Sequence, residues 1–417
     1  MNYVGRKEAS SNGISNSRLK KVTTLAVCLS PVLCIYRVLG IFMFGEVILI
    51  ALLFANILAT TDFNMYINRQ QSILYTFALE IFLISCIGYF ANDLPITALP
   101  RLIRFLFCLF MAAIIGGEFF EYKAAKKYII LIACVSTALI IFQKAYHDLT
   151  GEFIYFLSKE NIYSEIYNDA YFNNVETLST YRPMSIFLEP SHYCQYILFA
   201  LAIVLFKSKL SIKGTLLAAF FSVGIFISTS STGVILCLAL WGIYLFAMVK
   251  DGVINGGFSH KSFFIIALIV IVAITILSQF GDRFLFAIQR IYNPGSSSST
   301  VAWDSRLGTF SIFSEFNRLT DLLFGRGYGV INEGEWYASI PYFYSGTGIL
   351  GMLALVFFFL SMRLFSNRIQ GKLLLVLFIL SFTTEVLTNY WLIFILPLIM
   401  TAEEDKGMKY KKCDVRT

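Results

Sequence analysis

The stretch SGTGILGMLALVFFFLSMR, residues 345–363, has an uncharged apolar body that ends at Arg363. A helix needs about 20 mostly apolar residues to cross the hydrocarbon core of a bilayer. The first 18 residues of this stretch carry no charged side chain, and similar runs recur along the whole chain. The stretch therefore predicts a membrane-spanning helix, and its repetition predicts an all-α polytopic integral membrane protein.

The composition of the chain agrees with this class. Hydrophobic residues make up 57% of the 417 residues and charged residues only 14%, with a mean hydropathy of +0.71. These values exclude an ordinary soluble domain, and no nucleic-acid partner is expected. The eight cysteines lie mostly inside apolar segments without a CxxC pair, so we interpret them as small core residues and not as a disulfide or zinc framework.

The apolar segments divide the chain into a cytoplasmic polar leader (1–21), one transmembrane bundle (22–400) and a charged cytoplasmic tail (401–417). No small-residue cleavage site follows the first segment, so no secretory signal is expected. About twelve spans are predicted, provided that 214–249 and 373–400 each break into two helices at polar stretches near 228–233 and 388–389. The predicted spans are 22–36, 39–59, 72–91, 102–117, 128–143, 192–206, 214–229, 232–249, 262–279, 345–362, 373–386 and 388–400.

The positive charges between these segments predict the orientation of the bundle. With the N-terminus in the cytoplasm, the lysine-rich connections all fall on the cytoplasmic side, as the positive-inside rule requires. Both termini are then cytoplasmic. The basic residues placed inside are Arg69, Lys123, Lys126, Lys127, Lys207, Lys209, Lys213, Lys250, Lys261, Arg363, Arg368 and Lys372.

Two long polar intervals, 144–191 and 280–344, fall on the external face in this orientation. The first leans acidic, whereas the basic residues of the second are all arginines. A guanidinium group stays charged when partly dehydrated and binds phosphate or carboxylate through two hydrogen bonds. Functional residues are therefore expected in these loops, which the bundle holds in place. The five arginines of the second interval are Arg283, Arg290, Arg306, Arg318 and Arg326.

The end of the first interval, RPMSIFLEPSHYCQY (182–196), leads into a predicted span. Arg182 and Glu189 bracket an apolar segment that would hold both charges at the mouth of the bundle, where ionisable groups are usually functional. Pro190 suits the first turn of a helix, and the helix dipole favours an acid beside it, so Glu189 also fits a helix-start role. His192 fits interface packing as well as a site role.

In order and spacing, these elements resemble the Wzy-type O-antigen polymerases, in the superfamily that also contains the O-antigen ligases. The resemblance is carried by the arginine-to-Glu-Pro element at 182–190, the Ser/Thr-rich break ISTSSTG (227–233), the Ser-Arg pair at 305–306 and the turn GRGYG (325–329). The family implies a GT-C-like bundle of about twelve helices with two large periplasmic loops, in the bacterial inner membrane.

The resemblance also implies a reaction, the block transfer of oligosaccharide repeat units carried on undecaprenyl diphosphate. Arg306 and Arg326, followed by Arg182, would stabilise the leaving diphosphate, because preorganised donors stabilise developing charge. Glu189 would act as the base on the acceptor hydroxyl, with His192 as runner-up. Further substrate-binding candidates are Tyr328, Asp304 beside Arg306, and Ser230 in the Ser/Thr-rich break.

Other signals limit the cofactors and partners. Neither long loop contains a D-x-D pair and the chain has no P-loop, so no nucleotide-sugar donor, cofactor or metal ion is expected. The expected partners are the lipid-linked oligosaccharide, membrane lipid and a chain-length regulator protein. Arg101 and Arg104, at the external end of a predicted span, are outside candidates for binding the diphosphate, but a role in reaching the lipid headgroups fits them better. Glu385 is expected to mark a helix end, or else to line the same cavity as the loops.

Three alternative functions stay open. An O-antigen ligase shares the topology, but such ligases usually present a histidine in the second long loop, and 280–344 contains none. A lipid-oligosaccharide flippase or other transporter is favoured only by Glu46 and Glu80, which interrupt apolar segments. An accessory membrane subunit would leave the clustered arginines unexplained.

Overall fold

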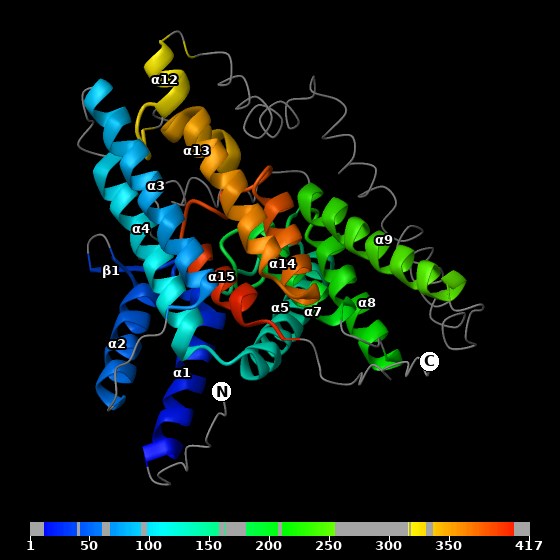
Figure 1. The fold of residues 1–417 in the computed structure, drawn as a ribbon. Helices are drawn as coiled ribbons and strands as arrows, with labels where there is room; N and C mark the ends of the chain where they lie inside the picture. Colours follow the sequence, from blue (N-terminus) through cyan, green and yellow to red (C-terminus); the bar gives the residue numbers. More distant parts are fainter. Residues whose placement is uncertain are drawn as a thin grey trace, which may run out of the picture.

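The structure, a computed structural model, describes residues 12–39, 42–60, 67–92, 98–157, 162, 181–206, 211–254, 316, 318–330 and 337–403. Helices make up most of this part of the chain (Figure 1). The elements are α1 (Asn12–Leu33), β1 (Arg37–Leu39), β2 (Phe42–Met43), α2 (Phe44–Ala59), α3 (Arg69–Ala91), α4 (Ala98–Ile114), η1 (Ile115–Phe119), α5 (Tyr122–Thr150), α7 (Pro190–Leu205), α8 (Ile212–Ile227), α9 (Ser231–Ile254), α12 (Leu319–Phe324), α13 (Ser339–Leu364), α14 (Arg368–Leu380) and α15 (Trp391–Thr401).

Five of these helical stretches are long and apolar enough to cross a membrane. The shorter apolar helices α2, α7, α8 and α15 coincide with further predicted spans. An all-α membrane protein is thus confirmed as the fold class, while the total of twelve spans stays a prediction, since 262–279 lies outside the described residues. The five long stretches are Arg69–Ala91, Ala98–Phe119, Tyr122–Thr150, Ser231–Lys250 and Ser339–Leu364.

Both predicted interruptions of long apolar runs are present. Helix α8 ends at Ile227 and α9 begins at Ser231, while α14 ends at Leu380 and α15 begins at Trp391. Short polar side chains at such positions bond to nearby backbone groups and compete with the helix. The hydroxyl of Ser228, for example, donates to the carbonyl of Ile225 at 2.7 Å.

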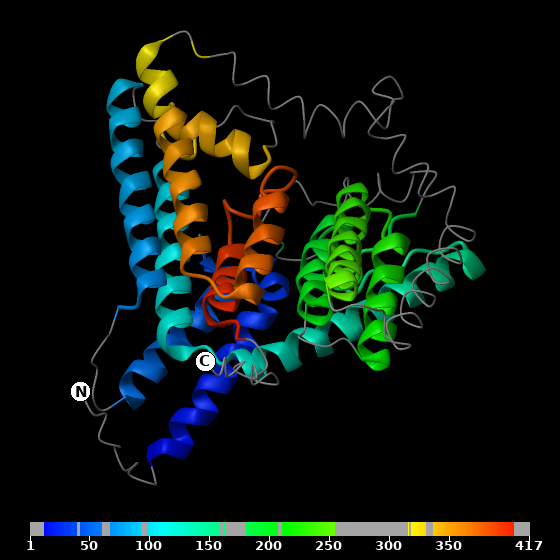
Figure 2. The same ribbon diagram turned by 45° about the vertical axis from the view of Figure 1, so that its right-hand side comes forward.

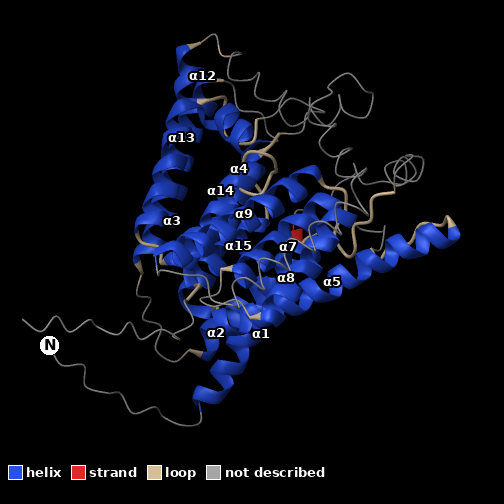
Figure 3. Cartoon of the chain, turned by 90° about the vertical axis from the view of Figure 1, so that its right-hand side faces the viewer, coloured by secondary structure: helices blue, strands red, loops and turns tan. Residues whose placement is uncertain are grey.

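Several features differ from the predicted boundaries. Helix α1 begins at Asn12, inside the predicted polar leader, α13 begins at Ser339, inside the second predicted loop, and α14 ends at Leu380, before the predicted 386. Helix α5 continues to Thr150, beyond the predicted end at 143, because the helix stops only where Gly151 adopts a φ of 74°. Between α1 and α2 the chain forms the hairpin β1–β2, whose antiparallel register pairs Arg37 with Met43 (red in Figure 3). The described chain is therefore helical except for this short hairpin and the connecting turns.

The helices form two packed groups with a third set between them (Figure 2). In one group, α3 packs against α4, α12 and α13, and in the other α7 packs against α5, α8 and α9. Helix α15 lies between the groups and contacts α4, α1 and α14. Almost every residue of α7 and α15 is buried, whereas outer helices expose large apolar side chains such as Leu58 and Phe246. Helices α7 and α15 are thus the most buried part of the bundle, and the exposed apolar side chains of the outer helices suit contact with lipid tails.

Candidate functional site

The segment that precedes α7 is held by one buried side chain of α5. The Oε1 atom of Gln143 accepts a hydrogen bond from the backbone N–H of Ser185 at 2.7 Å, and its Nε2 donates to the carbonyl of Ile154 at 2.9 Å. Gln143 thereby ties together two stretches of the first long loop. Met184, Phe187 and Leu188 are buried below it, as the apolar character of this segment predicts.

Arg182 reaches the break between α8 and α9. Its Nε donates to the Oγ1 of Thr229 at 3.3 Å, which joins positions that are 47 residues apart. Cys194 of α7 meets the same break, with its Sγ 3.0 Å from the Oγ of Ser228. The arginine element and the Ser/Thr-rich break, which the sequence predicts as two separate parts of one site, are therefore in contact.

Ser230, predicted to bind substrate, lies in this break and is 1% exposed. Its backbone N–H donates to the hydroxyl of Ser228 at 3.3 Å, and its own hydroxyl accepts from the backbone N–H of Gly233 at 3.4 Å. Both contacts stabilise the start of α9. Ser230 directly follows Thr229, the residue that accepts the hydrogen bond from Arg182.

Glu189 and His192 lie at the first turn of α7. Glu189 is the N-cap residue and Pro190 follows at the first helical position, which agrees with the helix-start interpretation. The Glu189 carboxylate makes no capping bond to the backbone but accepts from the hydroxyl of Ser191 at 2.7 Å. His192 is buried, with 4% exposure. An acid and an imidazole therefore lie side by side where α7 enters the bundle.

The turn between α14 and α15 brings Glu385 to His192. The Oε1 of Glu385 lies 3.8 Å from the Nε2 of His192, and the indole ring of Trp391 lies 5.9 Å from the imidazole ring. Ser339, at the start of α13, fixes the turn by donating to the carbonyl of Thr384 and accepting from the N–H of Leu387. Sequence reasoning favoured a helix-end role for Glu385 over a role in the site. The signal that indicated the site role was an acidic residue in a short polar turn.

The glycine-rich turn 325–329 packs against an interruption of α13. The backbone N–H groups of Arg326 and Gly327 donate to the carbonyls of Ser345 and Gly346 at 2.9 and 3.0 Å. The Arg326 guanidinium lies over the ring of Phe316, 5.4 Å from its centroid.

Tyr328 points into the aromatic core. It is fully buried, stacks on Phe105 at 4.6 Å, and its carbonyl accepts from the hydroxyl of Tyr89. Burial raises the pKa of the Tyr328 hydroxyl well above its usual range. The Tyr328 ring thus packs against other aromatic rings in this conformation, and its stacking on a sugar stays a prediction. Asp304 and Arg306, the other candidates of the second loop, lie outside the described residues.

Tyr181, next to Arg182, is excluded as a base by its surroundings. Burial raises the pKa of its hydroxyl to about 12, so the group stays protonated at neutral pH. The hydroxyl faces the carbonyl of Ile154 at 3.5 Å. Glu189 and His192, at the first turn of α7, stay the candidates for the proton acceptor.

Arg101 and Arg104 both make contacts within the protein, and their expected reach to the lipid headgroups stays a prediction. Arg101 donates to the carbonyl of Gly329 at 2.7 Å, and Arg104 forms a 2.7 Å ion pair with Glu46, whose side chain is 2% exposed. A buried carboxylate requires such a partner, because an unpaired charge is costly in an apolar interior. A structural role therefore accounts for Glu46, one of the two acids that favoured a transporter.

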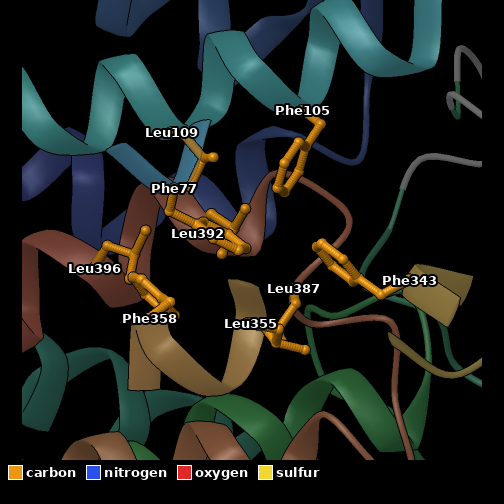
Figure 4. A pocket seen from close by; sticks show the side chains of 9 residues that line it. All are labelled: Phe77, Phe105, Leu109, Phe343, Leu355, Phe358, Leu387, Leu392 and Leu396. Carbon is orange, nitrogen blue, oxygen red and sulfur yellow. The ribbon is translucent and has the colours of Figure 1, made fainter. Parts of the chain in front are cut away.

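An apolar cavity lies between α3, α4, α13 and α15 (Figure 4). Only phenylalanine and leucine side chains line it, including Phe105, Phe343 and Leu387. Such a cavity offers no hydrogen-bonding group to a sugar or phosphate. Elsewhere in the described ranges, no cluster of three or more His, Cys, Asp or Glu residues is arranged to hold a metal ion.

The sequence matches no protein-family model and no curated protein. The geometry at α7 and the resemblance described above are therefore the grounds for a functional proposal.

Proposed function

We propose that the protein is a glycosyltransferase of the O-antigen polymerase type. It joins oligosaccharide repeat units carried on undecaprenyl diphosphate, at the periplasmic face of the bacterial inner membrane. The growing glycan is transferred as a block from its carrier to the non-reducing end of another lipid-linked unit. The observation that supports this proposal best is the contact of Arg182 with Thr229, in a break whose Ser228 also contacts Cys194 of α7, two residues after His192.

The chemistry requires a cation for the leaving group and a base for the acceptor. As the bond from the anomeric carbon to the diphosphate oxygen breaks, negative charge develops on the diphosphate. A fixed guanidinium such as that of Arg182 stabilises this charge, and the loss of one preorganised donor raises a barrier by about 2.7–4 kcal/mol. Glu189 or His192 accepts the proton of the attacking hydroxyl, and Arg306 and Arg326 complete the diphosphate site from the second loop.

The finer topology belongs to the same proposal. It comprises about twelve spans, two periplasmic loops and cytoplasmic termini, as the distribution of lysine and arginine predicts. The reaction needs no metal ion, because arginines neutralise the diphosphate. A chain-length regulator protein in the same membrane is the proposed protein partner.

Deletion of the gene in the producing strain tests the proposed reaction. On a gel of surface polysaccharide, we expect the ladder of polymer to collapse to a single repeat unit on the lipid core. Complementation with Arg182→Ala or Glu189→Ala should leave the single-unit pattern at normal amounts of membrane-inserted protein. Arg318→Ala, which removes an exposed arginine at the start of α12, is the matched control and should restore the ladder.

Two other patterns would contradict the proposal. Loss of all surface glycan, with polymer accumulating on its lipid carrier, would assign the protein to the ligases. A full ladder from both Arg182→Ala and Glu189→Ala would remove the site at α7.

A further inference from the structure

Glu385 faces the catalytic candidate His192 from a part of the chain that belongs to neither long loop. The Nε2 of the imidazole and the Oε1 of the carboxylate are 3.8 Å apart, and the side chains are 5% and 25% exposed. A carboxylate opposite one ring nitrogen fixes both the orientation of the imidazole and the position of its proton. Ion pairs and hydrogen bonds of this kind are often long before substrate binds.

The other ring nitrogen of His192 has no hydrogen-bond partner among the described residues. Its Nδ1 atom is buried and makes no hydrogen bond to any described residue. When the Nε2–H faces Glu385, the Nδ1 of the neutral ring carries the lone pair. It is then the nitrogen that can accept a proton from a bound hydroxyl.

Further buried polar atoms on α7 and at the start of α15 also lack hydrogen-bond partners among the residues that the structure describes. They are the Oε1 of Gln195, the Nδ2 of Asn389 and the Nε1 of Trp391. Gln195 lies three residues after His192 and therefore on the same face of α7. Trp391 contacts the imidazole ring, and its backbone N–H donates to the side chain of Asn389 at 3.1 Å.

Buried donors and acceptors without partners are rare in folded proteins, and several in one place call for a ligand or ordered water. A sugar suits this set, because each of its hydroxyl groups can both donate and accept a hydrogen bond. Glu385, whose side chain is 25% exposed, also interacts electrostatically with Tyr342 of α13. The 381–390 turn thus connects α7 with the helices that hold the glycine-rich turn.

We propose that Glu385 is a positioning residue that holds His192 with its Nδ1 toward the acceptor sugar, and that Gln195, Asn389 and Trp391 bind the hydroxyl groups of this sugar. The inference rests on the proposed function and assigns the role of base to His192. The acceptor hydroxyl forms its bond to the anomeric carbon and gives its proton to Nδ1. The diphosphate leaves with the electron pair of the broken C–O bond, and the proton then passes from the imidazole to water.

The test compares Glu385→Gln, Glu385→Asp, His192→Ala and the double variant His192→Ala/Glu385→Gln in the gene-deletion strain. The readout is the ratio of polymer to single-unit bands, normalised to protein in the membrane. Since a positioned base contributes about 10²–10⁴-fold, we expect Glu385→Gln to lower this ratio roughly tenfold or more. Glu385→Asp, which keeps the charge, should recover part of the loss.

The double variant separates positioning from a merely structural role. If Glu385 acts through His192, the double variant is no worse than His192→Ala, because the two side chains work as one unit. Glu403→Gln, an exposed acid near the end of α15, is the control and should keep the full ladder. Should His192→Ala fail to accumulate in the membrane, His192→Gln takes its place in the cycle.

Each remaining result decides against the inference. A full ladder from Glu385→Gln, or losses that multiply in the double variant, would overturn the role of Glu385 while leaving the polymerase proposal intact. An unchanged ladder after deletion of the gene would overturn both.

Discussion

Two residues near the candidate site hold a backbone conformation that their side chains disfavour. Ser185 and Thr229 have φ values of 59° and 55°, in the left-handed region. A β-branched residue such as Thr229 is an outlier there, and the conformation costs about 1–2 kcal/mol. Since Thr229 also binds Arg182, the strain lies at a position where the proposal needs a hydroxyl group.

Thr229→Gly separates stability from function at this position. Glycine removes the strain, so we expect the free energy of unfolding to stay equal or to rise by up to about 1 kcal/mol. The melting temperature in detergent should then stay equal or rise. Polymer formation should fall, because Arg182 loses its hydrogen-bond acceptor. Ser185→Gly is the control, since it relieves the same strain without touching Arg182 and should keep the ladder. Normal polymer from Thr229→Gly would argue against the Arg182 contact.

The ion pair of Glu46 and Arg104 predicts a stability effect remote from the site. Removing one partner of a buried pair costs about 3–5 kcal/mol, and less here because Arg104 is 31% exposed. We expect Glu46→Gln to lower the unfolding free energy by roughly 1–3 kcal/mol, seen as a lower melting temperature in detergent. Glu80→Gln, which alters a partly exposed acid on α3, should change it little. Equal effects of both variants would show that the pair is not stabilising.

Helix α13 depends on a glycine where it is interrupted. Gly348 has a φ of 60° and a ψ of −158°, a combination that is essentially restricted to glycine. A Cβ added there would lie 2.6 Å from the backbone N of Gly325. The interruption and the glycine-rich turn therefore fit each other backbone to backbone, which fixes the second loop to the bundle.

Gly348→Ala should for this reason damage the fold. We expect a large loss of monodisperse protein in fluorescence-detected size-exclusion chromatography, because neither backbone can move away cheaply. Gly242→Ala in α9 is a matched control, since an added Cβ meets no atom within 4 Å. It should be neutral or stabilise the helix by about 0.5–1 kcal/mol. Normal behaviour of Gly348→Ala would mean that the turn and α13 are less tightly packed than described.

For the bundle, the orientation across the membrane is the property that the proposed chemistry requires. Exposed positions for cysteine labelling exist on both predicted sides, at Arg69, the first residue of α3, and at Glu152 after α5. A membrane-impermeant maleimide should label Glu152→Cys in cells with a permeable outer membrane, and Arg69→Cys only after the inner membrane is opened. The unaltered chain, whose seven described cysteines are buried or half-buried, gives the background. The reverse pattern would place the site in the cytoplasm, away from its proposed substrate.

The sequence predicts the helices of this protein better than it predicts the contacts between them. Apolar runs located the helices, because each span satisfies its own backbone hydrogen bonds and needs only length and hydrophobicity. The polar breaks near 228 and 389 were likewise visible, since serine and threonine side chains compete locally with the helix. The hairpin after α1 was missed because no strong local signal marks it. The end of α5 was missed because the prediction followed the apolar run and not Gly151, a residue type that commonly ends helices.

Pairings between distant residues were not visible in the sequence. The pattern of apolar runs and positive charges was enough to predict a helical membrane protein. The charged segment before α7, together with the family resemblance, selected Arg182, Glu189 and His192 as candidates. Only the packing of α7 against the turns at 228–230 and 381–390 brought Thr229 to Arg182 and Glu385 to His192. Hydrophobicity is a property of each segment alone, so it can be read from the local sequence. The partner of a buried polar group depends on how the helices pack, and local sequence does not specify that packing.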